Sequence, residues 1–425
     1  MVNPTPRLQG RVAMKHFSLA TLLFICLAST VNADDWLQWR GPVRDGKSAE
    51  TGLLQQWREG GPALRWKRTD IGTGYSSPAI AAGVLYVQTT RGEEELALAL
   101  NEQTGEDKWS VPIGKVGKNR GPQYPGTRST PTVDGDRIYC LSSDGELTCL
   151  DVASGEQKWQ RQLKNDFAGV YGAWAYSESV LIDDDNLICT PGGDRASLVA
   201  LNKLTGETIW ESAVPDGGSA EYSSIMIADG GGRKQYVQFV RSGLVGVDAS
   251  SGEFLWMYGK IIDPGANILT PIVEGDNVFA AGSRTGGGLV QLKADGDGVT
   301  AEEIYFNNKL TPSIGGAVLL DGHLYGATSA GLFCADLMTG EFKWQERSVG
   351  AASVCYADGR LYARGHKSGE VALIEATPEA YREQGRFEQP DRSLKPAWPH
   401  PVVANGGLYL RDWESLHCYD IKAAE

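Results

Sequence analysis

Several chemical signatures are missing from these 425 residues. The sequence has no Cys-x-x-Cys-His motif, which excludes covalent haem attachment. It also has neither a Gly-x-Ser-x-Gly elbow nor a His-Glu-x-x-His pair, the motifs of two large groups of hydrolases. Its net charge of -13 repels phosphate, and no nucleic-acid-binding motif offsets that charge. We therefore expect no nucleic-acid partner and no hydrolase of these two kinds.

No apolar run reaches the ~20 residues that a membrane-spanning helix needs. The best run, FSLATLLFICLA, follows Met14 and Lys15 and leads to small residues that end at Ala33. This order is typical of a secretory signal peptide. We predict a signal peptide at residues 1–33, starting at Met14, and a periplasmic or secreted mature chain that does not span the membrane. A membrane anchor is the alternative.

Glycine and proline are abundant, with 53 and 19 residues, and they follow no collagen-like period. Such a composition indicates many tight turns between short strands. The hydrophobic share of 41% and the charged share of 22% are typical of a globular protein. These features predict an all-β fold.

A unit of about 40 to 50 residues repeats along the chain, a period typical of propellers and solenoids. The stretch TGEDKW at residues 104–109 returns as SGEQKW, TGETIW, SGEFLW and TGEFKW. Four short strands per unit predict one antiparallel blade, and a blade needs neighbours on both faces. Each unit closes on an aromatic residue, at Trp66, Trp109, Trp159, Trp210, Trp256, Tyr305, Trp344 and Phe387. The repeats predict an eight-bladed β-propeller.

The two ends of the repeat region complete each other. The last unit supplies three strands, whereas residues 63–71 form a single strand before the first full unit. Pairing of this strand with the last blade closes the ring and covers its open sheet edge. We predict an N-terminal extension at residues 34–62 and an eight-bladed propeller at residues 63–425.

The repeated motif resembles the tryptophan-docking repeat of the pyrroloquinoline-quinone-like (PQQ-like) β-propellers. Its pattern Ala-x-Asn/Asp-x-x-Thr-Gly-Glu-x-x-Trp is seen, for example, from Ala99 to Trp109. The resemblance covers essentially the whole predicted mature chain. This superfamily includes quinone-dependent alcohol dehydrogenases as well as propellers without a quinone, among them the outer-membrane β-barrel assembly propeller lipoprotein. The opening DDWLQWRGPVRDG resembles the N-terminal motif of exported members.

The resemblance implies a test for a cofactor. A quinone dehydrogenase of this family holds its quinone on the propeller axis over a calcium ion, beneath a ring of adjacent cysteines. This sequence has no Cys-Cys pair, and its DGDG stretch at residues 295–298 lacks the downstream acid of a calcium loop. We predict no catalytic residue, no metal and no cofactor. A dehydrogenase that uses pyrroloquinoline quinone and calcium on alcohols or sugars is the alternative.

The repeated tryptophan is interpreted as a brace between blades. Its indole buries on the order of 200 Å² and gives its N–H a backbone partner. Small residues two positions before the Asn or Asp of each motif make room for it. One of them, Cys149, is expected opposite Cys140 across a hairpin, either as a disulfide or as two buried thiols.

The turns divide between two faces of the propeller. We call one the connection face, because it holds the connections into each first strand and the turns between second and third strands. The other, the Gly-Glu face, holds the remaining turns and most acidic residues. Long connections at residues 111–128 and 161–176 lie on the connection face. Its predicted ligand-binding residues are Arg91, Arg128, Arg195, Arg241, Arg284, Arg411, Tyr75, Tyr124, Trp174 and Tyr222.

A cationic and aromatic face attracts an anionic ligand even when the whole protein is acidic. Arginine in a polar turn can also simply pair with neighbouring acids. We interpret the chain as an exported, non-catalytic binding or scaffold module of the cell envelope. The expected partner is an envelope protein, a glycan or another anionic ligand.

Overall fold

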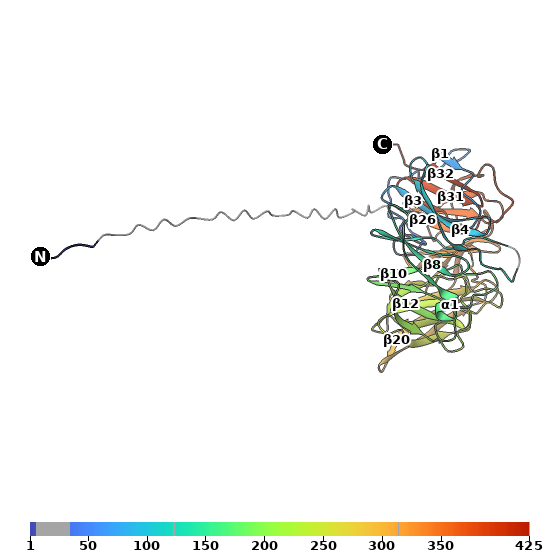
Figure 1. Ribbon diagram of the computed structural model, residues 1–425. Helices are drawn as coiled ribbons and strands as arrows, with labels where there is room; N and C mark the ends of the chain where they lie inside the picture. The colour runs from blue at the N-terminus through green and yellow to red at the C-terminus, as the bar shows by residue number, and fades with distance from the viewer. Residues whose placement is uncertain (6–34, 122–123, 313, 425) are drawn as a thin grey trace. The chain divides into compact units, whose positions relative to one another are not determined.

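The computed structural model describes residues 1–5, 35–121, 124–312 and 314–424. Most of the predicted signal peptide, including Met14 and Ala33, lies outside the described residues. The propeller belongs to one compact unit, Val31–Glu425, built from eight four-stranded antiparallel sheets (Figure 1). The predicted all-β, eight-bladed propeller is confirmed. The described ranges contain no helix with the length and hydrophobicity of a membrane span.

The strands of each blade lie in chain order across their sheet, except in the last blade. Blades 1 to 4 comprise β2 (Ala79–Ala81), β3 (Val84–Arg91), β4 (Glu94–Asn101) and β5 (Asp107–Lys115); β6 (Thr132–Asp134), β7 (Arg137–Leu141), β8 (Glu146–Asp151) and β9 (Gln157–Gln162); β10 (Leu181–Asp183), β11 (Asn186–Cys189), β12 (Leu198–Asn202) and β13 (Thr208–Ser212); and β14 (Met226–Gly230), β15 (Arg233–Val240), β16 (Gly243–Asp248) and β17 (Phe254–Tyr258). Blades 5 to 8 comprise β18 (Ile272–Glu274), β19 (Asn277–Gly282), β20 (Gly286–Asp295) and β21 (Gly298–Asn307); β22 (Ala317–Leu320), β23 (His323–Thr328), β24 (Gly331–Asp336) and β25 (Phe342–Glu346); β26 (Ala352–Ala357), β27 (Arg360–Gly365), β28 (Val371–Glu375) and β29 (Glu383–Phe387); and β30 (Val402–Ala404), β31 (Gly407–Asp412), β32 (Ser415–Asp420) and β1 (Ala63–Arg68).

In blade 1, burial distinguishes the first strand from the fourth. The first strand β2 is buried at every residue, whereas the fourth strand β5 is largely exposed. First strands therefore line the propeller axis, and fourth strands form the rim. A single short helix, α1 (Leu163–Phe167), follows β9 within the described part of the chain, and Leu163 and Phe167 anchor it in the core.

The ring closes as the sequence predicts. Strand β1 pairs with β32, with Trp66 opposite Cys418 and Lys67 opposite His417. Figure 1 shows β1, near the blue end of the colour scale, beside the red-brown strands β31 and β32. Segments from the two ends of the propeller thus share one sheet, which covers the edge that three strands alone would expose.

Five of the six docking tryptophans brace neighbouring blades through their ring nitrogens, whereas Trp256 Nε1 donates to Gln235 Oε1 of its own blade. Trp66 Nε1 donates to the carbonyl oxygen of Glu102 at 2.8 Å, and Trp109 Nε1 to that of Val152 at 3.1 Å. Each acceptor belongs to the next blade. Trp159, Trp210 and Trp344 repeat this bond. Opposite Trp109 in its own blade lies Ala99, one of the small residues predicted to make room for the indole.

Blade 7 departs from the predicted pattern. Phe387 is not its docking aromatic, because the register places Gly385 opposite Leu373, where the other blades carry the aromatic residue. Trp57 fills the empty slot from outside the blade. Its ring centroid lies 5.8 Å from that of Tyr362 and 5.2 Å from that of Phe387, and its backbone N–H donates to the carbonyl oxygen of Gln384. A residue of the predicted extension therefore replaces a repeat residue.

The two candidate cysteines lie on opposite faces of their sheet. Cys140 pairs with Thr148, whereas Cys149 pairs with Tyr139, so the expected direct opposition of the two cysteines is wrong by one residue. Alternate residues of a strand point to opposite sides. Both thiols are free and buried. The register therefore places the two thiols on opposite faces of the sheet, and of the two alternatives the structure shows a pair of buried thiols.

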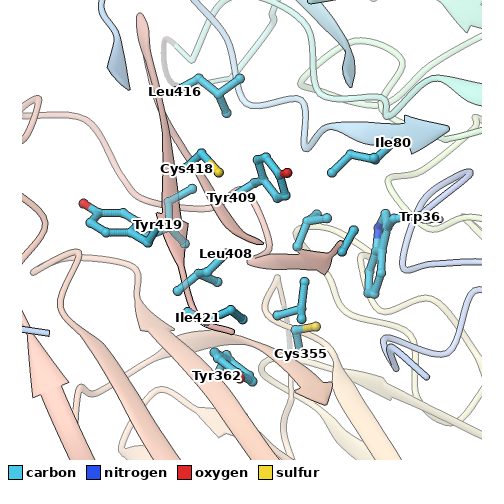
Figure 2. Close-up of a cluster of buried hydrophobic side chains, with 14 of the residues drawn as sticks. Trp36, Ile80, Cys355, Tyr362, Leu408, Tyr409, Leu416, Cys418, Tyr419 and Ile421 are labelled. Atoms are coloured by element: carbon cyan, nitrogen blue, oxygen red, sulfur yellow. The ribbon is translucent and has the colours of Figure 1, made fainter. Parts of the chain in front are cut away.

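Residues 35–48, which we call the axial segment, occupy the propeller axis. Trp36 exchanges two backbone hydrogen bonds with Ile80 of β2, and Leu37 accepts one from Val133 of β6. The N–H of Tyr356 in β26 of blade 7 donates to the carbonyl oxygen of Gly46. Figure 2 shows Trp36 beside Ile80 in a buried cluster that also contains Cys355 and Tyr409. The axial segment of the predicted extension therefore packs inside the ring, whereas Trp57 of the same extension packs against blade 7.

Two buried arginines hold the axial segment in place. Arg40 donates through Nη2 to the carbonyl oxygen of Ala317 at 2.5 Å, and Arg44 donates to those of Ser179 and Val180 at 2.6 and 3.0 Å. Both arginines have left-handed backbone, with φ of 60° and 62°. Hydrogen bonds between charged donors and buried carbonyls offset the cost of that conformation.

Candidate ligand-binding site

A cavity of about 260 Å³ lies where the connections between blades meet on the axis. Seven of the eight connections into first strands contribute to its wall, and the axial segment contributes Trp39. The lining residues are Trp39, Tyr75, Tyr124, Arg128, Trp174, Ser177, Ser179, Tyr222, Ser224, Ala266, Ile268, Ile314, Trp398, Pro399 and His400. We call this space the axial cavity. It opens on the connection face.

Aromatic rings in mutual contact form most of the wall. The ring centroid of Trp398 lies 5.0 Å from that of Tyr75 and 4.7 Å from that of Tyr124. Trp174 and Tyr222 form a second pair at 5.6 Å. Edge and tilted contacts at these distances stabilise ring pairs and hold them in defined orientations. The wall is therefore preorganised before any ligand arrives.

The floor of the cavity comes from the axial segment. Trp39 packs edge-on against His400, with ring centroids 4.7 Å apart, and its Nε1 donates to Thr270 Oγ1 at 3.0 Å. His400 Nε2 lies 2.9 Å from the carbonyl oxygen of Ile314. These contacts join the floor to blades 5, 6 and 8.

Arg128 positions two of the aromatic residues. Its Nη1 donates to the carbonyl oxygen of Trp174 at 2.7 Å, and its Nη2 donates to that of Tyr124. Burial lowers the pKa of the guanidinium from its usual value. The guanidinium therefore hydrogen bonds to the backbone of Trp174 and Tyr124 and holds these two wall residues in position.

The cavity offers little acid–base chemistry at neutral pH. Burial lowers the pKa of His400 to about 3, so its ring is neutral. Burial raises the pKa of Tyr75 and of Tyr222 to about 12. None of the described lining residues is a carboxylate or a thiol. The arrangement suits binding of an uncharged, largely apolar group, since most polar side chains of the lining already hydrogen bond within the protein.

The predicted site residues separate into two groups. The structure brings Tyr75, Tyr124, Arg128, Trp174 and Tyr222 together around the axial cavity. The remaining five arginines do not line it.

Three of those arginines pair with acids in or beside their own turns. Arg195 lies 3.1 Å from Glu211, Arg241 3.8 Å from Glu221 and Arg284 2.7 Å from Asp263. Arg91 is exposed at the end of β3. Arg195, Arg241 and Arg284 match the alternative in which turn cations neutralise nearby carboxylates.

Arg411 lies within β31 and is fully buried, rather than exposed in a turn. Its guanidinium donates to the carbonyl oxygens of Trp413, Gln88 and Gly72 and to Thr89 Oγ1. These partners lie in blade 8, in blade 1 and in the loop between β1 and β2. Arg411 therefore joins the two blades at the closure.

The ten predicted residues do not include Trp39, Trp398 and His400. Trp398 and His400 directly precede the first strand of blade 8, as Tyr222 precedes that of blade 4. An aromatic residue two to four positions before a first strand was the available signal. Trp39 had no such signal, because its place depends on the path of the axial segment through the ring.

Glu178 lies behind the cavity wall, between the lining residues Ser177 and Ser179. Its carboxyl accepts hydrogen bonds from the backbone N–H and the hydroxyl of Thr190, at 2.7 and 3.1 Å. Burial raises its pKa to about 8, although the nearby charge of Arg44 opposes the rise. The folded protein therefore keeps a proton on this carboxyl at neutral pH.

Replacing Glu178 by glutamine is expected to change how stability depends on pH. Below the ordinary pKa of 4.5 both states carry the proton, whereas between about pH 5 and 8 only the folded state does. The wild type should thus lose up to ~1.4 kcal/mol of unfolding free energy per pH unit more than Glu178→Gln across this range. Urea unfolding at pH 5, 6, 7 and 8 measures the difference. Equal slopes would contradict a protonated Glu178.

A calcium-bound quinone on the axis would need oxygen donors around it. Calcium takes six to eight oxygen ligands, mainly from carboxylates and carbonyls. The described lining of the axial cavity supplies no carboxylate. In the described ranges, no group of three or more His, Cys, Asp or Glu side chains can hold a metal ion. These residues do not fit a calcium-bound quinone on the axis.

The fold and the docking motif define this chain as a PQQ-like β-propeller with an aromatic cavity on its axis. The family model described as outer membrane protein assembly factor BamB matches residues 93–346, more than half of the sequence. The chain therefore belongs to the BamB family.

Individual relatives are distant. BamB from Yersinia pestis is 27% identical over 171 residues, which cover 38% of this chain and 39% of that protein. BamB from Moranella endobia is 24% identical over 240 residues, covering 54% of each chain. The matched segments thus span about half or less of these relatives. Quinohemoprotein alcohol dehydrogenase from Comamonas testosteroni is 12% identical over 92% of this chain and 81% of that one, with a TM-score of 0.50. This likeness concerns the fold alone.

Proposed function

We propose that this chain is an exported, non-catalytic binding propeller of the cell envelope, and that it holds a partner protein on its connection face. The observation that carries the proposal is the axial cavity, where seven of the eight connections meet around a preorganised aromatic wall. Propeller loops supply recognition while the blades supply rigidity. The absence of suitable calcium donors among the described lining residues favours binding over quinone chemistry.

Family membership supports the choice of partner. The BamB relatives are named as outer membrane protein assembly factors, which makes an envelope protein the preferred partner over a glycan or a small anion. The predicted signal peptide at residues 1–33 supports export. We accordingly place the mature protein in the periplasm or outside the cell.

Site-specific photo-crosslinking tests the proposal. A benzoylphenylalanine is introduced at Lys118 on the connection face, or at Glu253 in a turn on the Gly-Glu face, and each protein is irradiated in an envelope preparation. Both positions are exposed, which makes Glu253 a matched control. We expect a discrete protein adduct from position 118 and none from position 253.

Mass spectrometry of the adduct identifies the partner. Adducts from position 253 alone, or no protein adduct from either face, would contradict the proposal.

A further inference from the structure

The size of the axial cavity restricts what it can hold. Pockets for drug-sized ligands usually measure about 300 to 1,000 Å³. At about 260 Å³, the axial cavity lies just below that range and suits a smaller group, such as one large side chain. The half-buried rings of Tyr124, Trp174 and Trp398 form its walls.

The chemistry of the lining favours an apolar or aromatic group. Aromatic rings, Ile268, Ile314 and Ala266 supply most of the surface. A sugar ring needs several partners for its hydroxyl groups. Most polar side chains of the lining already have hydrogen-bond partners within the protein: Arg128, Ser179, Tyr222, Ser224 and His400. A second aromatic ring instead gains edge and tilted contacts with the existing ring pairs.

Two of the connections around the cavity carry exposed cationic side chains. Lys118, Arg120 and Lys395 are exposed, and none of them forms an ion pair with any residue that the structure describes. The N–H of Arg120 donates to the carbonyl oxygen of Ala173, next to the lining residue Trp174. Lys395 Nζ lies 5.2 Å from the ring centroid of Trp413, which in turn contacts Tyr75. Uncompensated cations beside an apolar cavity are complementary to acidic residues that flank an apolar anchor.

The geometry points to the axial cavity as an anchor pocket for one aromatic side chain of an acidic polypeptide segment. The inference rests on the proposed function and deepens it, because it specifies which chemistry the partner presents. Large aromatic side chains in desolvated pockets commonly supply most of the binding energy of an interface. The cations on the connections would steer the segment and fix its direction.

Fluorescence anisotropy with labelled heptapeptides tests the inference on the full mature chain. The probe carries one central tryptophan with three acidic residues on each side. The matched peptides carry alanine in place of the tryptophan, or lysine in place of the acids. We expect the probe to bind about tenfold or more tightly than either matched peptide. Its affinity should also fall as salt is raised.

Filling the cavity should abolish the interaction. Ile268→Trp places an indole in the lining and is expected to weaken probe binding about tenfold or more. Ile209→Trp is the matched control, because Ile209 is exposed on β13, outside the cavity. Ser177→Trp fills the cavity from another connection if Ile268→Trp does not fold, as judged by circular dichroism.

Charge reversal tests the cationic connections. Lys118→Glu combined with Arg120→Glu should weaken the acidic probe severalfold and remove much of its salt dependence. Lys108→Glu is the matched control at the opposite end of β5.

Some outcomes would overturn the inference. These are failure of the probe to bind, equal binding by the filled variants, or equal binding of the lysine peptide. Tight binding of a sugar oligomer or a fatty acid in place of the peptide would also overturn it. A crosslinked adduct that persists in Ile268→Trp would leave the proposed function standing and refute only the anchor pocket.

Discussion

Replacing Trp66 by alanine is expected to lower the free energy of unfolding by about 4 kcal/mol. The indole is only 9% exposed, packs against Tyr409 at a centroid distance of 6.2 Å and lies over Gly105 of blade 1. Its bond to Glu102 crosses the joint between the last blade and the first. The substitution therefore removes packing and a hydrogen bond where the ring closes. Urea unfolding followed by circular dichroism measures the change.

Two variants serve as controls for this prediction. Trp66→Phe keeps an aromatic ring and loses the bond from Nε1, so we expect a cost of about 1 to 2 kcal/mol. Trp159→Ala removes the same brace between blades 2 and 3. Each of these blades is built from four consecutive strands, so neither depends on pairing between the two ends of the chain. A loss of less than 1 kcal/mol for Trp66→Ala would show that the joint does not depend on this residue.

Replacing Arg411 by methionine is expected to cost about 3 kcal/mol or more, because several buried acceptors lose a charged donor at once. Methionine restores much of the volume and supplies no N–H. The carbonyl oxygens of Trp413 and Gly72, now 2.8 and 2.9 Å from the guanidinium, would lie unpaired in the core. Burial already lowers the pKa of Arg411 to about 9, which reflects the cost of holding its charge there.

The control for Arg411 is Arg91→Met. Arg91 is exposed at the end of β3, so we expect a change within about 0.5 kcal/mol. Chemical unfolding of both variants under the same conditions makes the comparison. If Arg411→Met unfolds at the same urea concentration as the wild type, water has replaced the guanidinium. Arg411 would then not be needed to join blades 1 and 8. If the variant is destabilised but still binds the acidic probe, the role of Arg411 is confined to the closure.

The structure gathers the aromatic residues of the predicted site around the axial cavity and places five of its six arginines elsewhere. Tyr75 and Tyr222 precede first strands, and first strands line the axis, so such side chains converge on it. Arg241 and Arg284 lie in turns between second and third strands, farther from the axis, where acids neutralise them. Charge along the chain does not reveal radial distance, which made these arginines look equivalent to Arg128.

The number of blades, their closure and the bracing role of the repeated tryptophan followed from the sequence alone. Each depends on a local pattern of strands and turns, or on contacts between neighbouring repeats, and a repeating sequence records both.

The path of the axial segment, the insertion of Trp57 into blade 7 and the composition of the axial cavity emerged only in the tertiary structure. They depend on contacts between residues far apart in the chain, such as Trp39 with His400 and Arg44 with Val180. A repeat pattern cannot predict such contacts, because the axial segment passes through the ring only once and contacts several different blades on its way.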